Sequence, residues 1–375
     1  MRRLAACALM LMLAAAAVPT ARVEARSVPP RFFGVMANGP LDLPSVDLGA
    51  EEALMRSSGV ATIRLPVRWP EIQPFRHLDD VPGVDRPRYT VIEGVPTDFS
   101  TLDRRVEAAA RNDLDVLALV LESPAWAAAT SFTPPRANAD YQRVLRALIG
   151  RYGPAGSFWA ANPSIPRHPI RNWQVWNEPS VRQYFDVPSF AKPYVRLLAS
   201  AYSAVKGTDR GATVIAAGLP NFSWRDAETL YAAGLRARGH FDALAVHPFT
   251  GRPADSVTIL RRVRAVLDRH GDQSAHLWVT EVSWPSARGK VSSAQRWVTT
   301  EAGQAARLRE AYLAYAKARQ SLRLDRVYWY SWATVDRDSP NSFDYAGLRT
   351  YTRAGDFADK PALAAYAAVS RALSR

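Results

Sequence analysis

The sequence alternates eight times, from residue 31 onward, between a short apolar run and a longer stretch with helical periodicity. The predicted strands are 31–36, 60–65, 114–121, 173–176, 213–217, 243–246, 277–279 and 326–332. The predicted helices are 50–58, 99–112, 140–152, 190–206, 224–236, 256–270, 302–318 and 361–373. Apolar residues at nearly every strand position are typical of parallel strands that are buried on both faces. The pattern predicts a single α/β domain over residues 31–375, a closed (β/α)8 TIM barrel rather than an open doubly wound sheet.

The first 25 residues differ from the rest of the chain. Arg2 and Arg3 precede the apolar run 4–18, and residues 23–25 include the small residues that a signal peptidase reads. Because a membrane span needs roughly 20 apolar residues, we expect a cleaved signal peptide over 1–25 instead. The single cysteine, Cys7, lies in this segment, so the mature chain would have no disulfide. We expect a secreted, periplasmic or cell-envelope protein that is not inserted in the membrane after cleavage.

Charge and histidine spacing exclude several function classes. The net charge of +13 comes mainly from arginines that are scattered singly, without a basic stripe interleaved with aromatic residues. Nucleic acid is therefore not an expected partner, whereas an anionic glycan or envelope surface stays open. The six histidines show no paired spacing, so no metal site and no cofactor are predicted. The chain also lacks the Gly-x-Ser-x-Gly elbow of many serine hydrolases, and a monomer is expected.

Two predicted strands end in a glutamate. The stretch 172–179 stops at an Asn-Glu-Pro corner that contains Glu178, and the stretch 277–285 contains Glu281. In a barrel both side chains project into the same mouth, and Arg64 ends the second strand there as well. Paired carboxylates are what glycoside hydrolysis requires, one as acid and one as nucleophile, about 5 to 5.5 Å apart in retaining enzymes. The alternative for either stretch alone is a solvated turn.

As a set, these residues resemble clan A of the glycoside hydrolases, the retaining barrel enzymes that include families 5 and 39. The resemblance covers the mature chain in strand order and implies a glycosidase that acts on a poly- or oligosaccharide. It further implies these roles: Glu178 as acid/base, Glu281 as nucleophile, Asn177 as partner of the sugar 2-hydroxyl, Arg64 as neighbour of the nucleophile, His247 at the end of the sixth strand, and Trp332 as an aromatic floor.

One position departs from the family pattern. Clan members often carry a tyrosine two residues after the sixth-strand histidine, and this chain has Phe249 there. A phenyl ring cannot donate a hydrogen bond to the nucleophile. Either another hydroxyl, from Tyr328 or Tyr330, takes that role, or Glu281 is held less well. The competing hypothesis is therefore a weak or inactive barrel that binds a glycan without cleaving it.

Aromatic residues and loops near the strand ends are the remaining candidates for substrate contact. We expect Trp126, Trp284 and Trp332 to stack on sugar rings, although a place in the core is the alternative for each. His247 is either a substrate contact or a structural histidine. The irregular segments 70–98 and 251–255 are expected to set specificity at the mouth of the barrel. Loop sequences alone do not predict which sugar or linkage is recognised.

Overall fold

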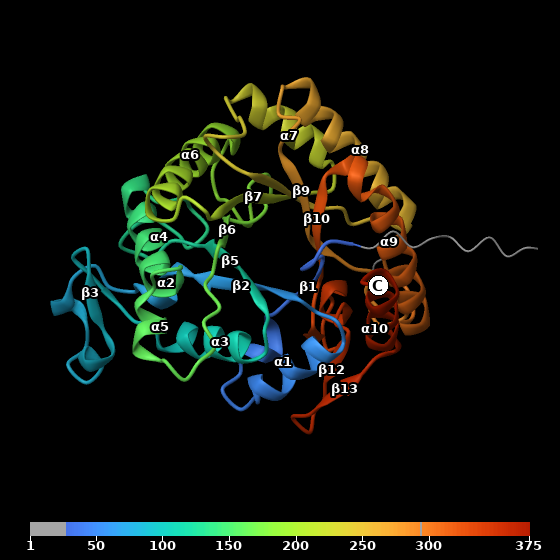
Figure 1. Cartoon of the computed structure of the whole chain (residues 1–375), viewed down its shortest axis with the longest axis horizontal. Helices are drawn as coiled ribbons and strands as arrows, with labels where there is room; N and C mark the ends of the chain where they lie inside the picture. Colours follow the sequence, from blue (N-terminus) through green and yellow to red (C-terminus); the bar gives the residue numbers. More distant parts are fainter. Residues whose placement is uncertain (1–27, 293–294) are drawn as a thin grey trace, which may run out of the picture.

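The computed structural model describes residues 28–292 and 295–375. Eight parallel strands form a closed barrel in the order β1-β10-β9-β8-β7-β6-β5-β2 (Figure 1). Their bounds are β1 Phe33–Met36, β2 Thr62–Arg68, β5 Asp115–Leu121, β6 Asn172–Val175, β7 Thr213–Pro220, β8 Ala243–His247, β9 His276–Val282 and β10 Leu324–Trp329. The predicted TIM barrel is therefore confirmed. The predicted signal peptide, 1–25, lies outside the described residues.

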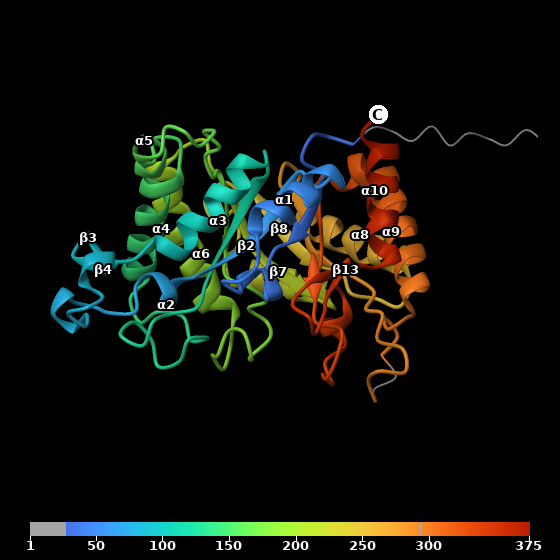
Figure 2. The same cartoon turned by 90° about the horizontal axis from the view of Figure 1, so that it is seen from below.

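Helices surround the barrel, as Figures 1 and 2 show from two directions. The eight that pair with barrel strands are α1 Leu48–Ser57, α3 Ser100–Arg111, α4 Asn138–Tyr152, α6 Ala191–Thr208, α7 Ser223–Ala232, α8 Pro253–Arg269, α9 Glu301–Leu322 and α10 Pro361–Leu373. Two short helices, α2 Trp69–Ile72 and α5 Ser157–Ala161, are additional. Within the described ranges, no helix combines the length and apolarity that a membrane span requires.

Several predicted element ends differ from the observed ones by three or four residues; among them, the second barrel strand continues past Arg64 to Arg68. Helix α7 ends at Ala232, four residues before the predicted end, because Gly234 has a φ of 95° and the Leu235 N–H bonds back to the Leu230 carbonyl. A left-handed glycine just past the last turn is a common helix stop. The last barrel strand ends at Trp329, so Trp332 lies beyond it and not on it.

The segment 70–98 is not the irregular loop that was predicted. It contains α2, two 3-10 turns (Leu78–Asp80 and Arg86–Arg88) and an antiparallel hairpin of β3 Thr90–Ile92 with β4 Val95–Thr97. The hairpin protrudes at the edge of the molecule, on the left of Figures 1 and 2. After β10 the chain forms a second small sheet of β11 Ala333–Thr334, β12 Arg349–Tyr351 and β13 Phe357–Asp359, with a 3-10 turn at Ser342–Tyr345.

The lower part of the barrel interior is filled by a small cluster of buried side chains. Its members are Leu117, Ile215, Ala243, Ala245, Trp278 and Tyr328. The Trp278 and Tyr328 rings stack with centroids 6.4 Å apart, and the Tyr328 hydroxyl lies 3.0 Å from the Thr62 hydroxyl. Gly34 makes room for this ring, since a Cβ there would lie 2.4 Å from Tyr328 Cδ1. This filled floor separates the mouth of the barrel from its opposite end.

Glu52 on helix α1 is a buried carboxyl whose two oxygens have no hydrogen-bond partner among the described residues. Burial raises the pKa of Glu52 to about 8, and the nearby charge of Arg105 opposes this rise. The folded protein therefore holds a proton that the unfolded chain, with a pKa near 4.5, releases. The contribution of protonated Glu52 to the free energy of unfolding is complete below about pH 4.5 and is lost as the pH rises through about 8.

We predict that Glu52→Gln reduces the loss of stability between about pH 6 and pH 9, because an amide carries no charge to bury. Urea denaturation of both proteins at the two pH values measures this, with Glu310→Gln on the exposed face of α9 as control. An equal pH dependence of the unfolding free energy in wild type and Glu52→Gln would contradict the assignment.

Candidate active site

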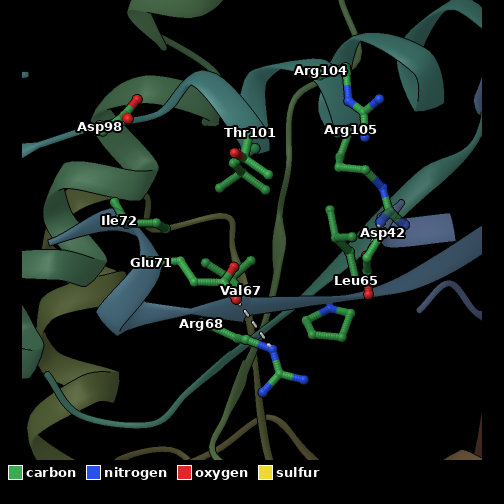
Figure 3. Close-up of a pocket in the computed structure, with 12 residues that line it drawn as sticks. Asp42, Leu65, Val67, Arg68, Glu71, Ile72, Asp98, Thr101, Arg104 and Arg105 are labelled. Carbon is green, nitrogen blue, oxygen red and sulfur yellow. Dashed lines mark hydrogen bonds and ion pairs between the residues drawn. The ribbon is translucent and has the colours of Figure 1, made fainter. Parts of the chain in front are cut away.

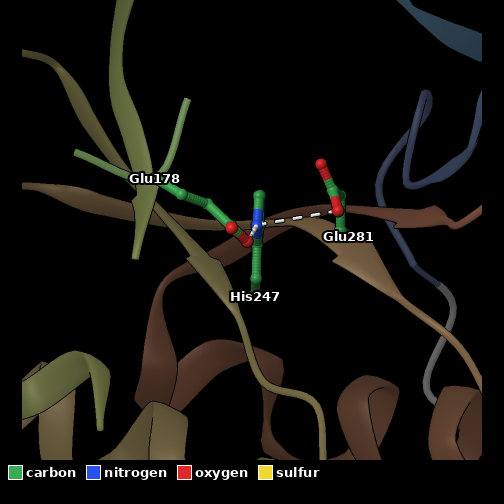
Figure 4. Close-up of side chains that lie close together, drawn as sticks. All are labelled: Glu178, His247 and Glu281. Carbon is green, nitrogen blue, oxygen red and sulfur yellow. Dashed lines mark hydrogen bonds and ion pairs between the residues drawn. The ribbon is translucent and has the colours of Figure 1, made fainter. Parts of the chain in front are cut away.

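Glu178 and Glu281 approach each other at the carboxyl ends of β6 and β9, with His247 from β8 between them (Figure 4). One carboxylate oxygen of each glutamate and one ring nitrogen of His247 all lie within 4.8 Å of one another. The two glutamate side chains are 12% and 11% exposed, so they face a restricted opening. The structure thus brings together the two strand-end glutamates on which the sequence hypothesis rests.

The corner that presents Glu178 has an unusual backbone. Trp176 and Glu178 adopt left-handed conformations with φ of 66° and 41°, although neither is glycine. The Trp176 amide donates to the Val120 carbonyl at 2.9 Å, and its indole N–H donates to the Tyr184 carbonyl at 2.6 Å. Such conformations persist only where the surroundings fix them, and they concentrate at functional sites.

Arg64 connects the two halves of the site from below. It is fully buried and donates to Glu281 Oε1 at 2.5 Å, to Asn177 Oδ1 at 2.8 Å and to Gln174 Oε1 at 2.8 Å. A charge-assisted hydrogen bond of this kind is directional and holds its acceptor in place. Arg64 therefore orients Glu281 and ties it to the strand that precedes Glu178.

His247 is completely buried and contacts both glutamates. Its Nδ1 lies 2.6 Å from Glu178 Oε1 and 3.7 Å from Glu281 Oε2, while Nε2 lies 2.9 Å from the Thr280 hydroxyl. On the opposite side, β7 closes on the ring at Gly218, where a Cβ would lie 2.0 Å from Nε2. The ring is not among the residues that line the neighbouring cavity, which is described below. Its location agrees with a structural role, in which the histidine positions Glu178.

Burial shifts the pKa values of Glu178 and His247 in opposite directions. It raises the pKa of Glu178 to about 7, against the opposing charge of Arg64. It lowers the pKa of His247 to about 4, although the negative charge of Glu281 favours the imidazolium. At neutral pH the histidine is therefore neutral, and Glu178 exchanges a proton readily. Glu281, in contrast, is ion-paired with Arg64.

The glutamates open onto a cavity of about 460 Å³ at the carboxyl ends of the barrel strands. Besides Glu178 and Glu281, its polar lining residues are Asn38, Arg68, Glu122, Asn177, Asn221 and Asn341. Its aromatic lining residues are Phe132, Tyr184, Phe249, Trp297, Tyr330 and Phe343. A mostly apolar wall with a few placed polar groups is usual for small-molecule sites, and aromatic faces suit the C–H faces of sugars. Neither 70–98 nor 251–255 contributes a residue to this lining, and their role in specificity stays a prediction.

None of the three tryptophans expected to stack on sugar lines this cavity. Trp332 is buried and its indole N–H donates to Glu51 Oε2 at 2.7 Å. Trp284 is buried and donates to the Thr250 carbonyl, and Trp126 donates to the Gln73 carbonyl, both at 2.8 Å. These residues secure loops around the barrel. Contact of these three tryptophans with a sugar stays a prediction.

Trp297 and Phe343, which were not among the predicted site residues, form an aromatic wall of the cavity. Their rings stack at 6.2 Å, and Phe343 also meets Phe249 at 4.8 Å and Tyr330 at 5.9 Å. Trp297 lies in the segment between β9 and α9, and Phe343 belongs to a 3-10 turn in the segment that joins β11 to β12. No strand or helix periodicity distinguishes such positions, so the sequence carried no signal for them.

Two tyrosine hydroxyls lie near the glutamates, where Phe249 provides none. Burial raises the pKa of Tyr330, with a further contribution from Glu281, and the Tyr330 side chain is hydrogen-bonded to Asn38. Burial also raises the pKa of Tyr184, and the charges of Glu178 and Glu281 add to this effect. Tyr330 was one of the two expected hydroxyls, and Tyr184 was missed. Tyr328, the other, sits in the barrel floor and cannot reach the pair.

The chemistry of the three groups does not favour a metal ion here. Glu178, His247 and Glu281 offer three ligand atoms close together. However, the Arg64 guanidinium already contacts Glu281 at 2.5 Å, and its positive charge opposes a cation in the same place.

A second cavity, of about 320 Å³, lies between β2 and α3, and Glu178, His247 and Glu281 are not among its lining residues (Figure 3).

We predict that Gly218→Ala lowers the free energy of unfolding by about 1 to 3 kcal/mol, the usual cost of overpacking a core. The new methyl group would have to displace the His247 ring. Gly150→Ala in α4 is the control, since a Cβ there meets nothing within 4 Å and alanine favours helix. Guanidinium denaturation measures both variants, and equal stability of Gly218→Ala and wild type would show that the ring is not confined.

Comparisons with known proteins support the fold. No family model matches the sequence, and no curated protein does. Among solved structures, a family 39 glycoside hydrolase from Bacteroides cellulosilyticus has a TM-score of 0.62 at 21% identity, over 92% of this chain and 64% of that one. A monomeric β-xylosidase from Caulobacter crescentus has a TM-score of 0.63 at 15% identity, over 92% and 69%.

A third similar structure is a GH5_18 protein from Streptomyces cattleya in complex with Manβ1-4GlcNAc, with a TM-score of 0.61 at 18% identity, over 92% of this chain and 80% of that one. At these identities the likeness establishes the fold alone. The chain spans less than two thirds of the length of the family 39 structure. The expected resemblance to the clan A barrels, which rested on a few strand-end residues, is confirmed as a resemblance of fold.

Proposed function

We propose that this protein is an exported retaining glycoside hydrolase that cleaves O-glycosidic bonds of a poly- or oligosaccharide. The observation that carries the proposal is the approach of Glu178 and Glu281, with oxygens within 4.8 Å across the mouth of the barrel. Retaining glycosidases hold their carboxyl groups about 5 to 5.5 Å apart, whereas inverting enzymes need roughly 6.5 to 9.5 Å for a water molecule. The similar solved structures, which include several glycoside hydrolases, agree with this class.

In the first step Glu281 attacks the anomeric carbon and forms a glycosyl ester, while the bond from that carbon to the leaving oxygen breaks. Glu178 gives its proton to the leaving oxygen. A pKa of about 7 suits this task, because Glu178 is then protonated in a useful fraction of molecules at neutral pH. Arg64 pairs with the attacking carboxylate and orients it.

In the second step the ionised Glu178 takes a proton from water, the water oxygen bonds to the anomeric carbon, and the ester to Glu281 breaks. His247 is a positioning residue in both steps, since its Nδ1 lies 2.6 Å from Glu178 Oε1 and the ring touches no cavity. Asn177, fixed by Arg64, lines the cavity beside Glu178 and is available to a sugar hydroxyl. No cofactor takes part in this scheme.

The setting of the proposed enzyme follows from sequence features. The signal-like segment 1–25 suggests export to the periplasm, the cell envelope or the medium. We propose that the mature protein acts there on carbohydrate as a monomer.

The aromatic wall of Trp297, Phe343 and Phe249 supports a carbohydrate ligand, since sugar C–H faces pack well on aromatic rings.

We predict that Glu281→Ala abolishes hydrolysis of p-nitrophenyl β-glycosides of glucose, mannose, galactose and xylose, because no covalent intermediate forms. Glu178→Gln lowers kcat/KM for substrates with poor leaving groups by about 100- to 10,000-fold, the range for one general acid. Glu310→Gln, on the exposed surface of α9, is the matched control. If the wild type is active and both site variants retain its turnover, the assignment is wrong.

The raised pKa of Glu178 predicts the alkaline limb of the pH profile. Protonated Glu178 is the required acid, so kcat/KM for a glycoside with a poor leaving group falls as the pH rises through about 7. A dinitrophenyl glycoside needs little protonation, and its kcat/KM should not show this fall. The same alkaline limb for both leaving groups would assign the limb to another residue.

The competing hypothesis, a barrel that binds glycans without cleaving them, rested on Phe249. The placement of Tyr330 and Tyr184 near the glutamates weakens that argument. An activated 2-deoxy-2-fluoro glycoside separates the two hypotheses, because a working nucleophile forms a stable ester with it. Mass spectrometry of the digested protein should find the adduct on the peptide that contains Glu281, and a binding protein would give none.

A further inference from the structure

Arg68 and Glu122 form an ion pair in the wall of the cavity that contains Glu178 and Glu281. Arg68 is the last residue of β2 and stands opposite Leu121 in the register of β2 with β5, so Glu122 follows directly after this pair. Guanidinium Nη1 contacts Glu122 Oε1. The proposed mechanism uses neither residue, although both face the place where a sugar would bind.

Strand register places this ion pair one strand away from the proposed acid. Strand β5 pairs with β6, and the Trp176 amide donates to the Val120 carbonyl at 2.9 Å. Glu122 lies two residues after Val120, and Glu178 lies two residues after Trp176. The two carboxylates therefore leave neighbouring strands at the same level of the mouth.

The ion pair keeps hydrogen-bonding capacity for a ligand. Arg68 is 45% exposed, and Glu71 lies 3.6 Å from its Nε. Within the part of the chain that the structure describes, neither Arg68 Nη2 nor Glu122 Oε2 makes a hydrogen bond. Arg68 borders both cavities, and Figure 3 shows its guanidinium on the other side of β2 from Arg104 and Arg105. A free donor and a free acceptor thus lie side by side at the mouth.

The backbone at Glu122 indicates that its position is specified. Its φ is 68°, in the left-handed region that a glycine would adopt without strain. The Glu122 side chain is only 10% exposed, so its carboxylate is held in the wall and does not extend into solvent. Burying a carboxylate on a strained backbone is costly, and such a residue persists where function requires it.

We infer that Arg68 and Glu122 determine sugar specificity by binding two adjacent hydroxyl groups of a neutral sugar. One hydroxyl donates to the Glu122 carboxylate, and its neighbour accepts from the Arg68 guanidinium. Because Glu122 balances the charge of Arg68, the pair suits an uncharged diol better than a sugar acid, which needs an unbalanced cation. This inference rests on the proposed function and names the substrate group that the site reads.

A substrate-and-residue cycle tests this inference. Wild type and Glu122→Gln are compared on the p-nitrophenyl glycoside that the wild type cleaves fastest and on its monodeoxy analogues. Wild type should lose at least about 100-fold in kcat/KM when the hydroxyl bound to Glu122 is removed, because the buried carboxylate is left unpaired. The loss should be smaller for the adjacent hydroxyl, because water can reach the half-exposed Arg68. Glu122→Gln should be slow on the parent and lose less than about tenfold further on the analogue that lacks the hydroxyl bound to Glu122.

Three controls make the cycle decisive. Glu93→Gln, which removes the carboxylate of an exposed ion pair with Arg146, should leave all ratios at the wild-type value. Thermal denaturation checks that Glu122→Gln is folded. Equal deoxy losses in wild type and Glu122→Gln would overturn the inference while the proposed function stands. A preference for the glucuronide over the neutral glycosides, lost in Arg68→Met, would also overturn it, since the pair would then be an anion site.

Failure of the proposed function has a different signature. In that case wild type hydrolyses no parent glycoside, and the cycle is measured by calorimetric binding of methyl glycosides and their monodeoxy analogues. If Glu122→Gln and the removal of one hydroxyl have non-additive effects on the binding free energy, the inference holds for a glycan-binding barrel. Independent effects of the residue and the hydroxyl, in binding as in turnover, would refute it.

Discussion

The site depends on one buried cation, the guanidinium of Arg64. A charge in the middle of a barrel is costly unless it is paired and its hydrogen bonds are satisfied. Here Glu281 supplies the counter-charge, and the side-chain oxygens of Asn177 and Gln174 accept the remaining bonds. Three strands, β2, β6 and β9, are thereby fixed relative to one another at the mouth. The floor of Trp278 and Tyr328 below keeps this layer closed to the far end of the barrel.

Glu178 and Glu281 have the same side chain but lie in different surroundings. Glu281 faces a cation, whereas Glu178 is buried against a neutral histidine, and burial raises its pKa to about 7. A carboxyl group whose pKa is raised by burial is suited to act as a general acid near neutral pH. His247 needs its own support for this purpose, which Gly218 provides by leaving space and Thr280 by a hydrogen bond.

Much of this arrangement could be predicted because parallel barrels obey strong rules. Strand alternation indicated the fold, and the carboxyl ends of strands placed Glu178, His247 and Glu281 in one mouth. Arg64, which was expected to end the second strand, lies within β2 and reaches the pair from below. The cavity lining does not include the tryptophans expected to stack on sugar, and Trp332 lies three residues past the end of β10 and donates its indole N–H to Glu51. The real wall, Trp297 and Phe343, comes from connecting segments whose course depends on tertiary packing and not on periodicity.

In the mechanism that we propose, Glu281 attacks the anomeric carbon directly, because Glu178 and Glu281 lie too close together for an intervening water. The stereochemistry of the first-formed product tests this most directly. Proton NMR during hydrolysis of a β-glycoside, recorded before mutarotation, distinguishes the two anomers. We expect the β-anomer to form first, by two displacements at the same carbon. Initial formation of the α-anomer would contradict it and would require a wider separation of the two carboxylates.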